Sequence, residues 1–196
     1  MPEAADALCS TGQVKDYLKI TGATWDALIG ELIDGVTDSI QSDTKRKFKQ
    51  ATYTNEDYNG NGTRILILKN YPIISVASLY DDVNRDFGAS TLIAAADYIV
   101  WKDEGEIELV EEKFTTGVGN VRITYDAGFA VIPQDLRDAC REEAAGIFER
   151  SKKGKAALGL DSASDEGGSE SYVALQDGFL PQTLQVLKRY RRLTIG

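Results

Sequence analysis

The sequence contains no histidine and only two cysteines among its 196 residues. Histidine is the commonest general base near neutral pH and a frequent metal ligand, so its absence removes most hydrolase and zinc-site arrangements. The chain also lacks a GxxxxGK[ST] phosphate loop and a GxSxG nucleophile elbow. We therefore expect no catalytic site, cofactor or metal ion, although a Ser/Thr–Lys or carboxylate-only site stays open.

Long apolar runs are also missing, and no stretch approaches the ~20 residues that cross a bilayer. The first residues, MPEAADALCS, lack the basic and apolar regions of a signal peptide. Cys9 lies near the N-terminus and Cys140 on an expected helix, which does not suggest a disulfide framework. We expect an unexported, soluble protein without membrane contacts, made in a reducing cytoplasm.

Acidic residues outnumber basic ones, and the net charge of −9 argues against general attraction to nucleic acid. The charges are segregated along the chain, which is typical of ordered contacts with protein partners. An acidic block spans 103–112. The basic residues gather in two clusters, Lys45, Arg46, Lys47 and Lys49 in the first and Lys188, Arg189, Arg191 and Arg192 in the second.

The spacing of apolar residues predicts two main helices, at about 25–48 and about 133–152. Apolar residues in the first follow the i, i+3, i+4, i+7 spacing, with Thr24 available as N-cap. The second begins near Pro133, whose fixed φ suits a first helical turn, and Asp135 complements the helix dipole. We expect these two helices to pack together as the core.

The region between these helices has the signals of an antiparallel β subdomain, at 53–126. Val121, Ile123 and Tyr125 alternate with polar residues, the pattern of a strand with one buried face. Further strands are expected at 64–69 and 73–80, and as a hairpin of 98–100 with 106–110. The fold class is therefore α+β, with the main domain at 13–152.

The two ends of the chain differ from this domain. Residues 1–12 are expected to be a loose leader, followed by a short helix with Val14, Tyr17 and Leu18. Residues 153–171, rich in Gly, Ser and Asp, predict a flexible linker. A C-terminal arm at 172–196 carries an amphipathic helix from Pro181, whose Leu184 and Leu187 must be buried, either on this domain or on a partner.

Three acidic residues, Glu104, Glu106 and Glu108, are expected on one face of a strand, opposite Ile107 and Leu109. They form either a solvated face or the wall of a DNA passage, where negative charge prevents phosphates from sticking. The cluster Lys45–Lys49 is either a helix end that complements the dipole or a contact for an acidic partner or DNA.

Two further motifs suggest ligand sites. Asp82-Val-Asn84-Arg-Asp86 matches the first oxygen positions of a calcium loop, but Ile93 stands where the bidentate Glu is needed, so we interpret it as a polar loop. Asn59-Gly-Asn-Gly62 lacks the strand-to-helix context of a phosphate site and is interpreted as a turn.

An ordered series of short motifs resembles the head–tail connector (adaptor) proteins of tailed bacteriophages and prophages. The series covers about residues 13–152. Its members are Val14-Lys-Asp-Tyr-Leu18, Trp25-Asp-Ala-Leu-Ile29, Leu32-Ile33, Asp57-Tyr-Asn-Gly60, Leu66-Ile-Leu68, Tyr71-Pro-Ile73, Val121-Arg-Ile-Thr-Tyr-Asp-Ala-Gly128 and Ile132-Pro-Gln-Asp-Leu136.

The resemblance implies a structural protein of the virion head–tail interface, not an enzyme. Copies in that family form a ring, commonly twelvefold, below the portal protein, which extends the DNA channel and offers a platform to a stopper or tail terminator protein. Double-stranded DNA would pass without sequence-specific contacts, and the arm at 172–196 would reach the portal or a neighbouring subunit and become ordered on assembly. The alternatives are a stopper or terminator, a nucleic-acid-associated module using the basic clusters, and a carboxylate-dependent hydrolase.

Overall fold

The computed structural model describes residues 3–152, 162–165, 168–171 and 178–192. The chain divides into two compact units, and the predicted α+β class is confirmed. The helical unit comprises 1–46 and 132–196, and the β unit comprises 47–131. The β unit is thus inserted in sequence between two halves of the helical unit.

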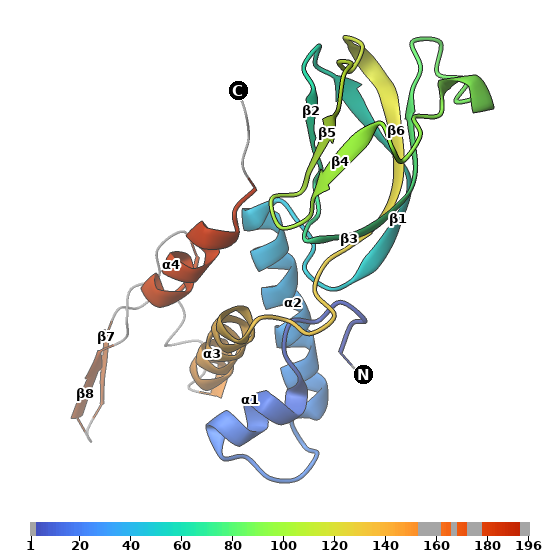
Figure 1. Cartoon of the computed structure of the whole chain (residues 1–196). Helices are drawn as coiled ribbons and strands as arrows, with labels where there is room; N and C mark the ends of the chain where they lie inside the picture. The colour runs from blue at the N-terminus through green and yellow to red at the C-terminus, as the bar shows by residue number, and fades with distance from the viewer. Residues whose placement is uncertain (1–2, 153–161, 166–167, 172–177, 193–196) are drawn as a thin grey trace. The chain divides into compact units, whose positions relative to one another are not determined.

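The helical unit is built from α1 (Thr11–Leu18), α2 (Asp26–Thr44), α3 (Gln134–Lys152) and α4 (Pro181–Tyr190), as Figure 1 shows. Helices α2 and α3 contact each other, and each also contacts both α1 and α4. One stripe of α2 is buried because its apolar residues recur at helical spacing. The buried apolar side chains of this unit include Ile29, Ile33, Ile40, Phe148 and Leu187.

Helix α2 is shorter than predicted and begins without the expected cap. Its N-cap is Trp25, not Thr24, and no side chain caps it. Lys45 adopts a left-handed conformation with φ 58°, which ends the helix at Thr44. The basic cluster Lys45–Lys49, which was predicted to lie at the end of this helix, therefore lies beyond it.

The segment before α1 is packed, so the expected loose leader is wrong for its described part. Leu8 is 2% exposed and Cys9 is 6% exposed. The Ser10 side chain accepts a hydrogen bond from the Gln13 backbone amide, and the Gln13 side chain accepts one from the Ser10 backbone amide, a capping box that starts α1.

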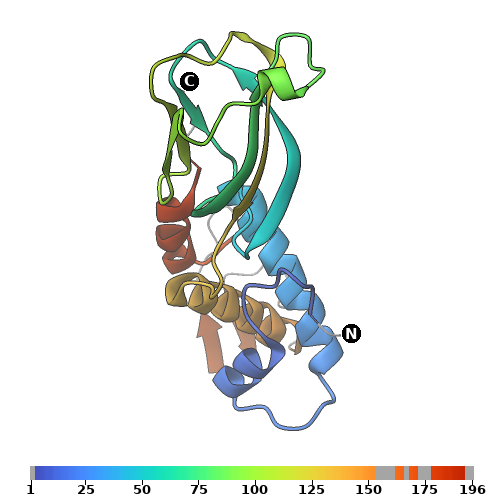
Figure 2. The ribbon, with the colours of Figure 1, turned by 45° about the vertical axis from the view of Figure 1, so that its right-hand side comes forward.

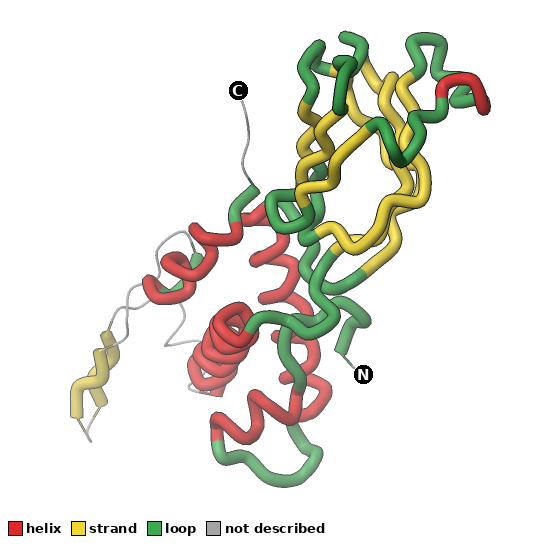
Figure 3. The backbone as a smooth tube through the Cα atoms, viewed as in Figure 1, coloured by secondary structure: helices red, strands yellow, loops and turns green. Residues whose placement is uncertain are grey.

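The β unit contains two antiparallel sheets that face each other (Figures 2 and 3). The long-stranded sheet has the order β1-β6-β3 and the short-stranded sheet the order β2-β5-β4. A single 3-10 turn, η1 (Ala89–Thr91), lies between β3 and β4. The strands are β1 (Ala51–Gly60), β2 (Ile65–Ile67), β3 (Ile73–Asp81), β4 (Tyr98–Trp101), β5 (Glu106–Leu109) and β6 (Gly117–Ala127).

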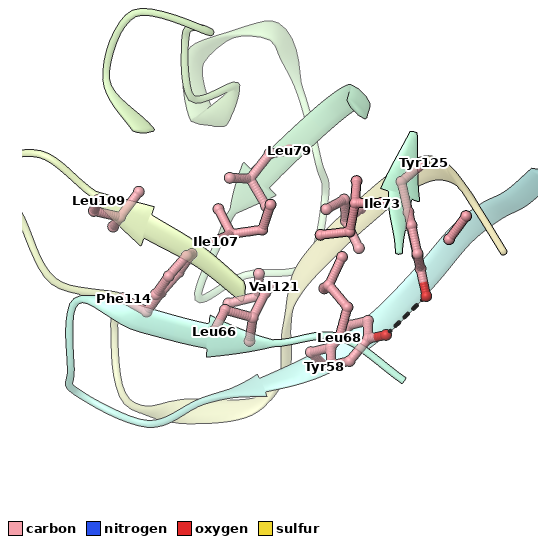
Figure 4. Close-up of a cluster of buried hydrophobic side chains, with 12 residues drawn as sticks. Tyr58, Leu66, Leu68, Ile73, Leu79, Ile107, Leu109, Phe114, Val121 and Tyr125 are labelled. Carbon is pink, nitrogen blue, oxygen red and sulfur yellow. Dashed lines mark hydrogen bonds between the residues drawn. The ribbon is translucent and has the colours of Figure 1, made fainter. Parts of the chain in front are cut away.

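The core of the β unit lies between these sheets, and β6 supplies much of it. Val121, Ile123 and Tyr125 are fully buried, as their alternation predicts. Ile107 of β5 reaches the same cluster from the opposite sheet (Figure 4). The predicted hairpin is also confirmed, with Tyr98 opposite Leu109 and Trp101 opposite Glu106.

The turn expected at 59–62 starts later, because Asn59 and Gly60 belong to β1. Within the expected linker, β7 (Ser162–Asp165) pairs with β8 (Gly168–Ser171) as an antiparallel hairpin. The other linker positions, 153–161 and 166–167, lie outside the described residues.

The two ends of the β unit are joined by backbone hydrogen bonds. The Phe129 amide donates to the Phe48 carbonyl at 2.7 Å, and the Gln50 amide donates to the Phe129 carbonyl at 3.2 Å. Gly128 makes this approach possible, since its φ is +107° and an added Cβ would lie 2.6 Å from the Lys49 carbonyl oxygen. The glycine that ends β6 thus allows the entering and leaving segments to pair.

Replacing Gly128 with alanine should therefore lower the free energy of unfolding by more than about 1 kcal/mol, because both the dihedral angle and the backbone contact exclude a side chain. Urea unfolding measures this loss. Gly88→Ala is the matched control, since φ is −78° and the added Cβ meets open space. Equal unfolding midpoints for the two variants would contradict the assignment.

Candidate functional site

The outer face of the short-stranded sheet carries two of the three predicted acidic residues. Glu106 and Glu108 point away from the core, because Ile107 and Leu109 between and beside them are buried. Glu104 is different: it lies in the turn between β4 and β5, so it does not share their strand face. Only Glu106 and Glu108 of the three predicted glutamates therefore share a strand face.

This face is apolar on both sides of the carboxylates. Strand pairing places Ile65 and Ile67 of β2 opposite Glu108 and Glu106, respectively. On the other side, Ile99 and Trp101 of β4 pair with the same glutamates, and both are 47% exposed. The Trp101 indole N–H donates to Glu108 at 3.0 Å, which fixes the ring over the strand. The sheet therefore presents two carboxylates framed by large apolar side chains.

Helix α4 packs on its own chain. Leu184 and Leu187 are 7% and 0% exposed, and α4 contacts α2 and α3. Of the two alternatives for these leucines, the structure shows burial within this chain. Helix α4 and its neighbouring residues, 180–192, thus pack on this chain itself. Residues 172–177 and 193–196 lie outside the described residues.

The start of α4 is held by a buried carboxylate on α3 that the sequence did not single out. The Leu180 amide, at the N-cap of α4, donates to Glu143 Oε1 at 2.5 Å. Glu143 is 2% exposed, and this burial raises its pKa above the ordinary 4.5 although the Leu180 amide opposes the shift. Glu143 thereby takes the place of a local side-chain cap for α4, although it lies 37 residues before Leu180 in the sequence.

The basic residues at the end of α4 are largely engaged in ion pairs. Arg189 Nη2 lies 3.1 Å from Asp135 of α3, and the Tyr190 hydroxyl donates to Asp135 at 2.8 Å. Burial, reinforced by Asp135, raises the pKa of Tyr190 to about 12. Lys188 is exposed. These contacts fasten the last turn of α4 to the first turn of α3.

Two arginines after α4 occupy the C-terminal end of α2. The Arg191 guanidinium donates to both oxygens of Asp43, at 2.8 and 3.0 Å. The Arg192 amide donates to the Thr44 carbonyl at 3.1 Å. A cation beside the negative end of a helix dipole is favourable, so these residues take the role predicted for Lys45–Lys49.

The first basic cluster is divided between the two units, and one of its members is buried. Lys45, Lys47 and Lys49 are exposed, whereas Arg46 is 5% exposed. Lys45 and Arg46 belong to the helical unit, and Lys47 and Lys49 to the β unit. Contact of the three lysines with an acidic partner or DNA stays a prediction.

A polar cluster at one edge of the β-unit core was also missed. The hydroxyls of Tyr58 and Tyr125 lie 2.5 and 2.8 Å from Glu56 Oε2. They also lie 3.3 Å from each other (Figure 4). Lys69 Nζ lies 3.1 Å from the other Glu56 oxygen. Burial raises the pKa of both tyrosines, so they stay protonated donors. Because the carboxylate has these partners, we interpret the cluster as structural.

The Asp82 motif organises a loop, as interpreted from the sequence. Its carboxylate accepts hydrogen bonds from the amides of Asn84, Asp86 and Phe87 at 2.8–3.1 Å. Burial alone would raise the pKa of Asp82, but these backbone donors lower it below its ordinary value. In the described part of the chain, no group of three or more Asp, Glu, Cys or His could hold a metal ion.

An open groove of about 590 Å³ lies beside η1 and β5. Asp81 in its wall is occupied, since it accepts hydrogen bonds from the Thr115 amide at 2.6 Å and from Asn120 at 3.0 Å. The groove therefore offers no poised general base at Asp81. None of the helices in the described ranges is both long and apolar enough to span a membrane.

The charged side chains described above meet at helix ends and on sheet faces. The chain belongs to the head completion protein family, whose model matches residues 7–193. This membership confirms the resemblance to phage connector proteins and a role in virion assembly.

Solved structures of gene transfer agent (GTA) particles contain chains with a similar fold. A chain from the virion of the native GTA particle is 19% identical, with a TM-score of 0.57, and the match covers 98% of this chain and 94% of that one. Chains from the neck of the empty particle, computed with C6 symmetry, and of the native particle, computed with C12 symmetry, are 18% and 20% identical. Both have a TM-score of 0.55 and cover 100% of this chain and 96% of theirs. No curated protein matches the chain.

Glu143 should make stability depend on pH. Because its folded pKa is above 4.5, the unfolded chain loses this proton first, so the free energy of unfolding should fall as pH rises from 4.5 through the raised pKa. Glu143→Gln should lack this fall. Urea unfolding between about pH 4 and 7 tests it, with Glu142→Gln, a partly exposed neighbour, as the control for removing a charge from α3. Parallel profiles for the wild type and Glu143→Gln would refute the claim.

Proposed function

We propose that this chain is the head–tail adaptor of a tailed phage or phage-like particle. Copies form a ring below the portal protein, extend the DNA channel, and offer a docking platform to the next tail-side protein, a stopper or tail terminator. The observation that supports this most directly is the match of essentially the whole chain to chains from GTA necks, together with membership of the head completion protein family.

A ring needs two different complementary patches on each subunit, because every copy meets its neighbour head to tail. The neck structures that contain the similar chains were computed with sixfold and twelvefold symmetry, which supports a ring of twelve copies here. The segregated charge of this chain suits such a heterologous contact, since one sign can face the other across each interface.

We assign the outer face of the short-stranded sheet to one side of this contact. A wall for passing DNA would be hydrophilic, yet Ile99 and Trp101 leave large apolar groups exposed beside Glu106 and Glu108. Apolar side chains around charges are typical of protein interfaces. The opposing patch is the end of α4 on the neighbouring copy, where Lys188 and Arg189 are exposed.

The neck assignment is tested by assembling particles without this chain. We expect DNA-filled heads that carry no tails, because the platform between portal and tail is missing, and added purified protein should restore joining. Electron microscopy of the particles counts the joined tails. Tails that join normally without the chain would refute the proposed function, and tails of irregular length on joined particles would favour the terminator alternative.

Reversing the two sheet glutamates, as E106K/E108K, should abolish the ring while leaving the fold intact, because like charges then face each other across every interface. We expect at least about a tenfold loss of subunit association, measured by mass photometry of neck complexes. The control E31K/D38K makes the same change in net charge, but at exposed positions of α2.

The neutral variant E106Q/E108Q separates the interface from the channel wall. Intact rings with slowed DNA delivery would favour the wall predicted from the sequence, in which the carboxylates repel phosphates. Rings and delivery that both stay unchanged in E106K/E108K would assign these glutamates to a solvated face and refute the interface.

A further inference from the structure

The two cysteines of the chain, 131 residues apart in sequence, meet in the helical unit. Cys9 Sγ lies 3.3 Å from Cys140 Sγ, and the side chains are 6% and 0% exposed. Both are free thiols. The two free thiols agree with the expectation that the chain has no disulfide framework, but their proximity was not predicted from the sequence. A disulfide bond needs the sulfurs about 2.05 Å apart, so closure requires an approach of only about 1 Å.

Besides the buried Leu8 side chain, the segment that carries Cys9 is attached through polar contacts with one face of α2. The Ala4 amide donates to Asp34 at 2.8 Å, and the Leu8 amide donates to the Thr37 hydroxyl at 3.2 Å. One turn further along α2, the Gln41 side chain donates to Asp6 at 3.2 Å. Hydrogen bonds of this kind are individually weak in water, so the segment is held loosely compared with a covalent link.

We propose that Cys9 and Cys140 are a modification site: they close to a disulfide when the chain meets a small-molecule disulfide such as oxidised glutathione. The bond would clasp the segment before α1 to α3. This inference does not depend on the neck function, although a virion protein made in a reducing cytoplasm would meet such oxidants after release from the cell.

The reaction has two balanced steps of thiol–disulfide exchange. When the segment before α1 opens and Cys9 leaves its hydrogen bond to Cys140, the Cys9 thiol loses its proton and attacks one sulfur of glutathione disulfide, which forms a mixed disulfide and releases one glutathione. The Cys140 thiolate then attacks Cys9 Sγ, forms the internal bond and releases the second glutathione. Two protein thiols are oxidised and one small disulfide is reduced to two thiols.

The local environment suits Cys140 as the thiol that completes the bond. The hydrogen bond that the Cys9 thiol donates to Cys140 stabilises a Cys140 thiolate, so it lowers the pKa of Cys140 and raises that of Cys9. The Thr37 hydroxyl, 3.9 Å from Cys140 Sγ, adds to this effect. Once Cys9 carries glutathione it no longer donates to Cys140, so the second step is favoured by the short distance between the two sulfurs and by the Thr37 hydroxyl.

The test incubates the full chain with oxidised glutathione, then unfolds and alkylates it. We expect a monomer that has lost both alkylatable thiols and two hydrogen atoms, with the peptide containing Cys9 linked to that containing Cys140. The midpoint of thermal unfolding should rise, because the link constrains the unfolded chain, and a reductant should reverse the rise.

Single variants provide the matched controls. Cys9→Ala and Cys140→Ala should form no internal link and should show no oxidant-dependent change in the unfolding midpoint. The thiol count of the wild type needs no variant, so it tests the proposal even if Cys140→Ala fails to fold. Two free thiols after incubation, a stable glutathione adduct, or links between copies would each overturn the proposal.

Discussion

The backbone hydrogen bond between Phe48 and Phe129 is the contact on which the division of this chain into a helical unit and a β unit depends. The chain leaves the helical unit after Arg46 and returns to it at Ile132, so that unit is made from two separate stretches of sequence. Joining the ends of the β unit converts the intervening segment into a closed loop. The end of α2 and the start of α3 are then separated by a closed loop instead of an open chain of the same length, which lowers the entropy cost of bringing α2 and α3 together.

Helix α3 is the element to which both flanking segments attach. Its first turn binds the end of α4 through Asp135, its middle receives the N-terminal segment at Cys140, and the next turn caps α4 through Glu143. Asp135 and Glu143 thus bind opposite ends of α4, Cys140 contacts Cys9, and all three residues lie within nine positions of one another. A single helix thus combines ionic, thiol and capping contacts, while its apolar residues form the unit's core.

Elements with a strong local signal were predictable from the sequence. The alternation at Val121–Tyr125 identified β6, and Pro133 with Asp135 placed the start of α3 within one residue. Errors arose where a local pattern allowed two conformations, as at Lys45, whose left-handed backbone ends α2 early. The contacts of Cys9 with Cys140 and of Glu143 with Leu180 have no local signature, because they join residues far apart in sequence. The face of Glu106 and Glu108 was predictable, but its apolar frame needed the strand register.

The positions of the two tryptophans give each unit its own optical reporter. Trp25 lies in the helical unit, edge-on to Phe148 with 5.6 Å between ring centroids. Trp101 lies in the β unit, with its indole bonded to Glu108 on the exposed sheet face. Single-tryptophan variants would therefore resolve the fluorescence of each unit separately. Emission from Trp101 would report the arrival of a neighbour on that face, and emission from Trp25 would report the packing around α3.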